Sequence, residues 1–106
     1  MTQPGSAPKP TIQPFLEVAP IPNEPLRYWV SSQKQGQPPY VVDLSMNEGS
    51  GACVCTDFIT RRQPAVNMGK QLFTDQTSCK HVRAARNYFT ERTLRDMAQM
   101  LNKNQG

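Results

Sequence analysis

The chain has 106 residues, which fits one domain rather than two. Hydrophobic residues make up 37% of the sequence and aromatic residues 8%, so the core is small, and small domains of this kind often add a metal ion or a disulfide. The formal net charge of +4 is compatible with a nucleic-acid partner but does not establish one. No stretch approaches the ~18 apolar residues of a membrane span.

Residues 1–25 hold most of the prolines of the chain. Seven of the ten lie there: Pro4, Pro8, Pro10, Pro14, Pro20, Pro22 and Pro25. Proline fixes φ and lacks the N–H group that helices and strand pairing use. We therefore predict a disordered, proline-rich arm over residues 1–25 and a folded domain over residues 26–106. The N-terminus also lacks the charged and apolar regions of a secretory signal.

Two segments of the folded part are rich in aromatic and β-branched residues and predict β-strands. Residues 27–32 form the first and residues 40–44 the second, and the proline- and glycine-containing segment between them predicts the loop of an antiparallel hairpin. Residues 53–59 are expected to form a third short strand, with Phe58 directed into the core. Residues 60–76 show no clear periodicity and are expected to form a surface loop.

The strongest helix pattern follows this loop. Thr77 and Ser78 are favourable N-cap residues, and apolar residues then recur at helical spacing. They fall in two groups on shifted phases: Val82, Ala85 and Phe89, then Leu94, Met97, Ala98 and Leu101. We predict one helix over residues 79–102, with a bend or interruption near Thr90.

Three cysteines and the only histidine form two short pairs, Cys53-Val54-Cys55 and Cys79-Lys80-His81. A tetrahedral zinc ion takes four nitrogen or sulfur ligands, and an odd number of cysteines does not suit a disulfide framework. Cys79 also lies at the predicted helix start, where free N–H groups favour a thiolate. The pattern predicts one structural Zn²⁺ held by Cys53, Cys55, Cys79 and His81, with no open position for a substrate. The alternative is a redox dithiol of Cys53 and Cys55.

This pattern, C-x-C…C-x-H with a hairpin before it and a helix after it, resembles the SWIM zinc finger. Residues 40–44 are similar to the strand that leads into the first metal-binding pair of that family, and residues 79–85 are similar to its C-(K/R)-H helix start. The resemblance covers about residues 27–90. It implies a zinc-bound ββα-like domain, of the kind found alone in small phage and bacterial proteins, that binds DNA or another protein without catalysis.

The predicted elements and the metal site together give an α+β fold. We expect a small zinc-stapled domain in which an antiparallel β-hairpin or three-stranded sheet packs on one C-terminal helix. Because free cysteines and metal clusters suit a reducing environment, we expect a cytoplasmic or nucleoid-associated protein. No catalytic motif or phosphate-binding glycine loop is present, so we expect neither an enzyme nor a small-molecule ligand.

Basic residues gather on the predicted helix and in the loop before it. Lys80, Arg83 and Arg95 fall within one arc of an ideal helix, opposite Val82 and its apolar neighbours. The candidate nucleic-acid contacts are Arg61, Arg62, Lys80, Arg83 and Arg95. We expect DNA or RNA binding by an accessory factor of replication, recombination or transcription. A solvated helix face explains the same charges equally well.

A protein–protein interaction adaptor without nucleic-acid contact is the alternative function. Its partner would bind the N-terminal arm or an apolar stripe of Leu94, Met97 and Leu101, which suits a partner helix or a second copy of the chain. The same stripe would otherwise cover the sheet of its own chain.

Overall fold

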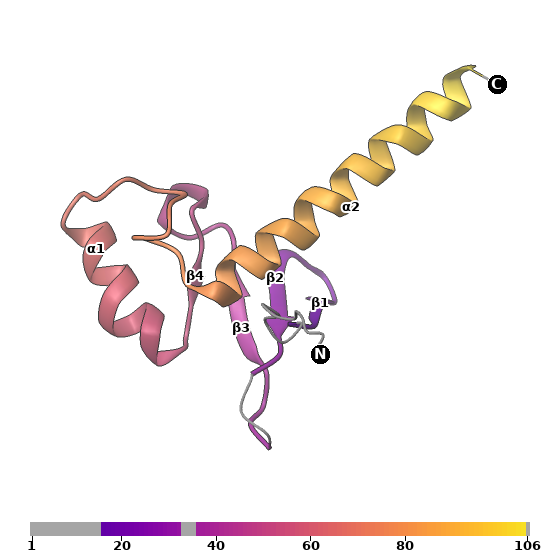
Figure 1. Ribbon diagram of the computed structural model, residues 1–106. Coiled ribbons are helices and arrows are strands. Elements are labelled where there is room, and N and C mark those ends of the chain that lie inside the picture. The colour runs from indigo at the N-terminus through magenta and orange to yellow at the C-terminus, as the bar shows by residue number, and fades with distance from the viewer. Residues whose placement is uncertain (1–15, 33–35, 106) are drawn as a thin grey trace, which may run out of the picture.

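The structure is a computed structural model that describes residues 16–32 and 36–105, and it confirms an α+β fold (Figure 1). A four-stranded antiparallel sheet, in the order β1-β2-β3-β4, packs against the first part of a long C-terminal helix. The strands are β1 (Val18–Ile21), β2 (Glu24–Val30), β3 (Tyr40–Asp43) and β4 (Ala52–Cys53). The helices are a 3₁₀ turn (Asn47–Gly49), a π-helical turn (Phe58–Arg62), α1 (Gln63–Asn67) and α2 (Lys80–Gln105).

Strands β2 and β3 form the predicted hairpin, in which Tyr28 pairs with Val42 and Val30 pairs with Tyr40. Along β2, Tyr28 and Val30 are buried while Trp29 between them is exposed. This alternation places one face of the sheet against α2, as expected for a sheet covered on one side.

Strand β1 corrects the predicted boundary of the N-terminal arm, because part of the segment assigned to the arm belongs to the sheet. Ser31 N donates a hydrogen bond to Glu17 O, so in this antiparallel register Pro20 lies at a position that makes no hydrogen bond to β2. The N–H group that Pro20 lacks would make no hydrogen bond to β2 there, so proline removes none of the hydrogen bonds that pair β1 with β2. Residues 1–15 of the predicted arm lie outside the described residues.

The segment after β4 corrects a second expectation. Of the predicted strand over residues 53–59, only Cys53 lies in a strand, as the last residue of β4. Residues 58–67 are helical, so the first part of the surface loop predicted over residues 60–76 is wrong. Phe58 N donates a hydrogen bond to Cys55 Sγ over 3.4 Å, which begins the helical turn directly after the second cysteine. Phe58 is buried, as predicted.

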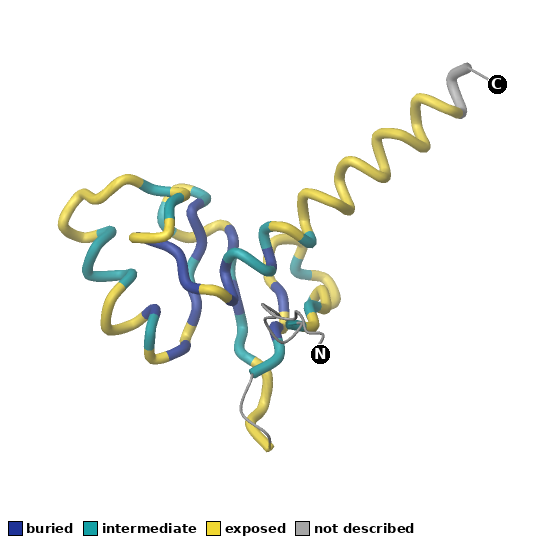
Figure 2. The backbone as a smooth tube through the Cα atoms, in the orientation of Figure 1, coloured by how far each residue is buried: buried dark blue, intermediate teal, exposed yellow. Residues whose placement is uncertain are grey.

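Helix α2 is uninterrupted over Lys80–Gln105, so the predicted break near Thr90 is wrong. Val82 and Ala85 are buried against the sheet, but Phe89 is 38% exposed, and the residues that follow are exposed as far as burial is described (Figure 2). The phase shift of the apolar residues therefore marks the point where α2 leaves the sheet, and not a bend.

The core is small and continuous with the cysteine residues. Its buried members are Tyr28, Val30, Val42, Leu44, Phe58, Val82 and Ala85, together with Cys53, Cys55 and Cys79. Among the described residues, no helix combines the length and the apolar character needed to cross a membrane.

Candidate metal centre

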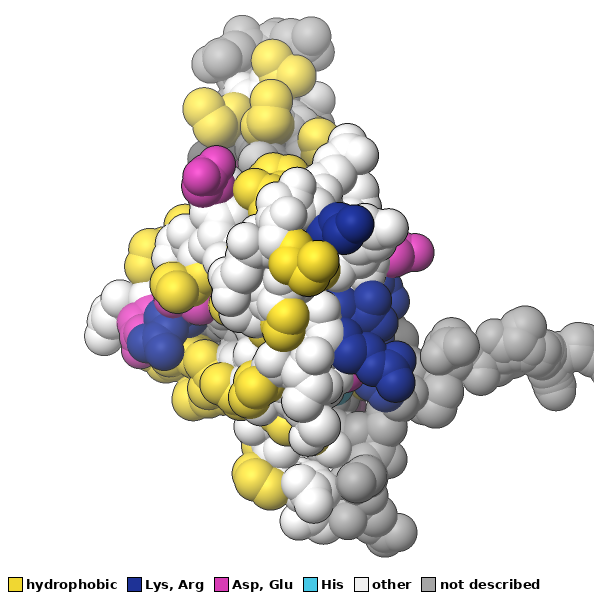
Figure 3. All heavy atoms as spheres, turned by 90° about the vertical axis from the view of Figure 1, so that its left-hand side faces the viewer, with side chains coloured by type: hydrophobic (Ala, Val, Ile, Leu, Met, Phe, Trp, Pro, Cys, Tyr) yellow, Lys and Arg dark blue, Asp and Glu magenta, His cyan; other side chains and the backbone are white. Residues whose placement is uncertain are grey.

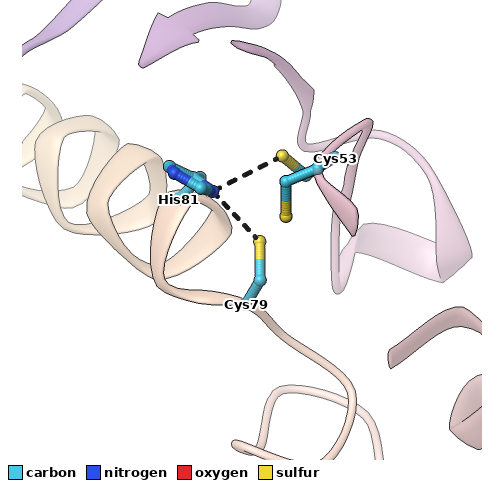
Figure 4. A group of neighbouring side chains, drawn as sticks. Cys53, Cys79 and His81 are labelled. Atoms are coloured by element: carbon cyan, nitrogen blue, oxygen red, sulfur yellow. Dashed lines mark hydrogen bonds between the residues drawn. The ribbon is translucent and has the colours of Figure 1, made fainter. Parts of the chain in front are cut away.

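The structure brings Cys53, Cys55, Cys79 and His81 together at one buried point between the sheet and α2. Cys53 ends β4, Cys79 directly precedes α2, and His81 lies in its first turn. The ligand atoms of all four residues lie within 4.8 Å of one another. His81 Nδ1 lies 3.8 Å from Cys53 Sγ and 3.8 Å from Cys79 Sγ, so this nitrogen faces the sulfur atoms (Figure 4).

These distances fit a tetrahedral metal ion. Metal–sulfur bonds of ~2.3 Å and metal–nitrogen bonds of ~2.0 Å place a ligating nitrogen about 3.5 Å from each sulfur. The Tyr40 ring lies beside the imidazole, with the two ring centroids 4.6 Å apart, and helps to hold its orientation. The four residues can therefore hold one metal ion, and each of them is buried.

Without a metal ion, the three thiols have different pKa values. The Cys53 thiol donates a hydrogen bond to Cys79 Sγ, and the N–H group of Val82 is a further donor to the same sulfur. These hydrogen bonds stabilise the thiolate and lower the pKa of Cys79 to about 4, although burial acts in the opposite direction. The same shared proton, together with burial, raises the pKa of Cys53. Burial raises the pKa of Cys55. One thiolate and two protonated thiols therefore occupy the cluster at neutral pH.

We expect metal binding at neutral pH to release about two protons, from Cys53 and Cys55, because only thiolates ligate the ion and Cys79 is already ionised. Affinity should therefore fall as the pH is lowered, since protons then compete with the metal. Calorimetric titration in buffers of different ionisation enthalpy measures the released protons. A release of none would contradict the pKa order given above.

The side chain of Arg86 ties together the two segments that deliver the cysteine pairs. Its guanidinium donates hydrogen bonds to Ser50 O and, over 3.4 Å, to Ser78 Oγ. It also lies 5.4 Å from the centroid of the Phe73 ring. The sequence pattern does not distinguish Arg86 from the other helix cations, because its partners are distant in the chain.

Three of the five predicted phosphate contacts lie beside the metal centre. Arg62, Lys80 and Arg83 line a small hollow, and the other residues that line it are Cys55, Asp57, Cys79 and His81. Figure 3 shows a group of Lys and Arg side chains on one side of the face that it presents, with other basic side chains apart from this group.

Acidic and carbonyl groups fix two of these cations in place. Arg62 Nε lies 2.9 Å from Asp57 Oδ2, and its guanidinium donates a 2.7 Å hydrogen bond to Asp75 O. Arg83 donates a 2.9 Å hydrogen bond to Ser78 O and lies 3.4 Å from Asp75 Oδ1. The carboxylates offset part of the positive charge while holding the guanidinium groups.

The other two predicted contacts lie apart from this hollow. The Arg61 side chain is 75% exposed and is 3.9 Å from Asp57. Arg95 follows Lys80 by about four helical turns, roughly 22 Å along α2. The arc predicted for Lys80, Arg83 and Arg95 is therefore not one compact cluster.

The fold and the site define a small α+β domain whose sheet and helix meet at a buried cluster of three cysteines and one histidine that can hold a metal ion. Comparison of the chain with protein-family models, with curated proteins and with solved structures gives no match. The function is therefore argued from the site itself.

Proposed function

We propose that this protein is a non-enzymatic SWIM-type zinc domain that binds DNA or RNA as an accessory factor of replication, recombination or transcription. A donor set of three sulfur atoms and one nitrogen favours zinc over harder cations. Four protein ligands fill a tetrahedral site, so the ion is structural and has no position for a substrate. The thiolate ligands suit a reducing, cytoplasmic compartment.

The observation that carries the nucleic-acid proposal is the group of Arg62, Lys80 and Arg83 around the hollow beside the metal centre. Phosphate oxygens are recognised by guanidinium and ammonium groups. Since Arg62 and Arg83 are already held by Asp57 and Asp75, less side-chain freedom is lost when a phosphate binds.

The test is a fluorescence-anisotropy titration of the zinc-loaded protein with labelled single- and double-stranded DNA and with RNA at several salt concentrations. We expect log affinity to fall linearly with log salt concentration. Arg83→Glu should weaken binding and make the salt slope shallower by about one, because one phosphate contact is lost.

Arg95→Glu provides the matched control, since it makes the same charge change far from the hollow. Equal weakening by both variants would show that net charge alone drives binding and would contradict a localised site. Zinc content is measured for each variant, because Arg83 contacts the residue before Cys79. No binding at low salt by protein that holds one zinc would reject the nucleic-acid proposal.

A protein-interaction adaptor is the second candidate function. The exposed apolar residues on the second half of α2 favour it.

A further inference from the structure

The second half of α2 extends away from the folded body, which comprises the sheet, α1 and the first half of α2 (Figure 1). From Phe89 to Asn102 each residue is exposed. After Phe89, this segment carries four more large apolar side chains: Leu94 is 61%, Met97 53%, Met100 64% and Leu101 61% exposed. The predicted stripe therefore does not cover the sheet of its own chain.

The apolar side chains of this segment share one face of the helix. At about 100° per residue, one arc of about 160° contains only uncharged residues, namely Thr90, Thr93, Leu94, Met97, Ala98, Met100 and Leu101. Leu94, Met97 and Leu101 have the alternating three- and four-residue spacing of the a and d positions of a coiled coil. This spacing is typical of a helix face that packs against another helix.

The charged residues lie on the opposite side of the helix, where acidic and basic residues are spaced to pair with one another. Glu91 and Arg95 are four residues apart, as are Arg92 and Asp96. This polar face lacks the excess of cations that marks helices lying on a membrane surface. The apolar arc itself offers no cation to a phosphate, so nucleic acid does not fit it either.

We propose that this face pairs with the same face of a second copy of the chain, which makes the protein a homodimer. The positions that flank a coiled-coil seam decide which helices pair, and here they are Glu91, Thr93, Ala98 and Met100. Only one of them is charged, so an identical helix meets almost no opposing like charge. Met100 and Ala98 also widen the apolar contact on both sides of the seam.

The two helices run antiparallel in this dimer. The folded body of each copy packs on the first half of α2, as the contacts of α2 with the strands show. Parallel helices would force the two bodies together at one end, whereas antiparallel helices keep them at opposite ends. A helical segment of about this length is marginally stable alone in water, so the second copy also stabilises it.

The test is sedimentation equilibrium of the zinc-loaded full chain from low to high micromolar concentration. We expect a dimer, and Met97→Asp should weaken the association by at least about 100-fold, because a carboxylate would be buried in the seam. Gln99→Asp is the matched control: it places the same carboxylate on the polar face of the same turn and should leave the dimer intact. Both variants should keep their zinc.

Three results would overturn the proposal: a monomeric wild-type protein, a dimer that survives Met97→Asp, or equal weakening by both variants. Deletion of residues 1–15 should leave the dimer unchanged. A different result would be a monomer in which residues 1–15 protect the backbone amides of residues 94–101 from hydrogen exchange. That result would show that the N-terminal arm, and not a second copy, packs on the apolar face of α2. No nucleic acid enters the experiment, so its outcome is independent of the function proposed above.

Discussion

The protein is expected to be unfolded when Cys79 is replaced by serine or His81 by alanine, because either change removes a ligand of the candidate metal centre. Both residues join the start of α2 to the end of β4, and the remaining core is small. Structural zinc contributes ~10–16 kcal/mol in small zinc-finger peptides at neutral pH, as much as the total stability of a typical domain. Circular dichroism and metal analysis should show loss of cooperative unfolding together with loss of the ion, and a strong chelator should have the same effect on the wild-type protein.

Val54→Ala is the matched control for this prediction. Val54 lies between Cys53 and Cys55 but is 60% exposed, so its truncation should change the free energy of unfolding by less than about 0.5 kcal/mol. A Cys79→Ser variant that unfolds like the wild-type protein would show that no metal ion stabilises the fold. A redox role for Cys53 and Cys55 would then be the better interpretation.

Gly51→Ala is expected to lower the free energy of unfolding by about 2–5 kcal/mol. Gly51 has φ +101°, and a Cβ atom there would lie 2.8 Å from Val82 Cγ1 and 3.3 Å from Leu44 Cδ2. The backbone conformation costs a side chain ~1–2 kcal/mol, and overpacking of a buried site adds ~1–3 kcal/mol. Since Val82 is fully buried and follows His81 directly, displacement of Val82 should also weaken metal binding.

Gly69→Ala separates the cost of the backbone conformation from the cost of overpacking. Gly69 has φ +83°, but no atom lies within 4 Å of a Cβ atom built there. Its replacement should therefore cost only the backbone contribution, about 1–2 kcal/mol. Urea denaturation of both variants measures the difference, and equal losses would show that the predicted contact with Val82 does not cost free energy.

The sequence alone determined the parts of this protein that depend on local chemistry. The identity and spacing of Cys53, Cys55, Cys79 and His81 restrict them to very few chemical roles, so the cluster was predictable before its geometry was known. The hairpin of β2 and β3 and the start of α2 were also predictable, because strand alternation and helical spacing act over a few neighbouring residues. The predicted N-cap role of Thr77 is wrong, since its hydroxyl donates to Gln71 O and not to the start of α2.

Only the tertiary structure decided the features that depend on distant partners. In the sequence, Pro20 indicates a break in a strand; only the structure shows that Pro20 occupies a strand position that makes no hydrogen bond to β2. Arg86 reads as a surface cation until Ser50 and Phe73 are brought to it. The sequence pattern of the apolar residues after Phe89 fits a core face, the commoner case, and also an interaction surface. Periodicity shows that a helix face is apolar but not what lies opposite it. The apolar face after Phe89 is exposed because α2 extends beyond the sheet. The spacing of residues in the sequence does not show where the sheet ends.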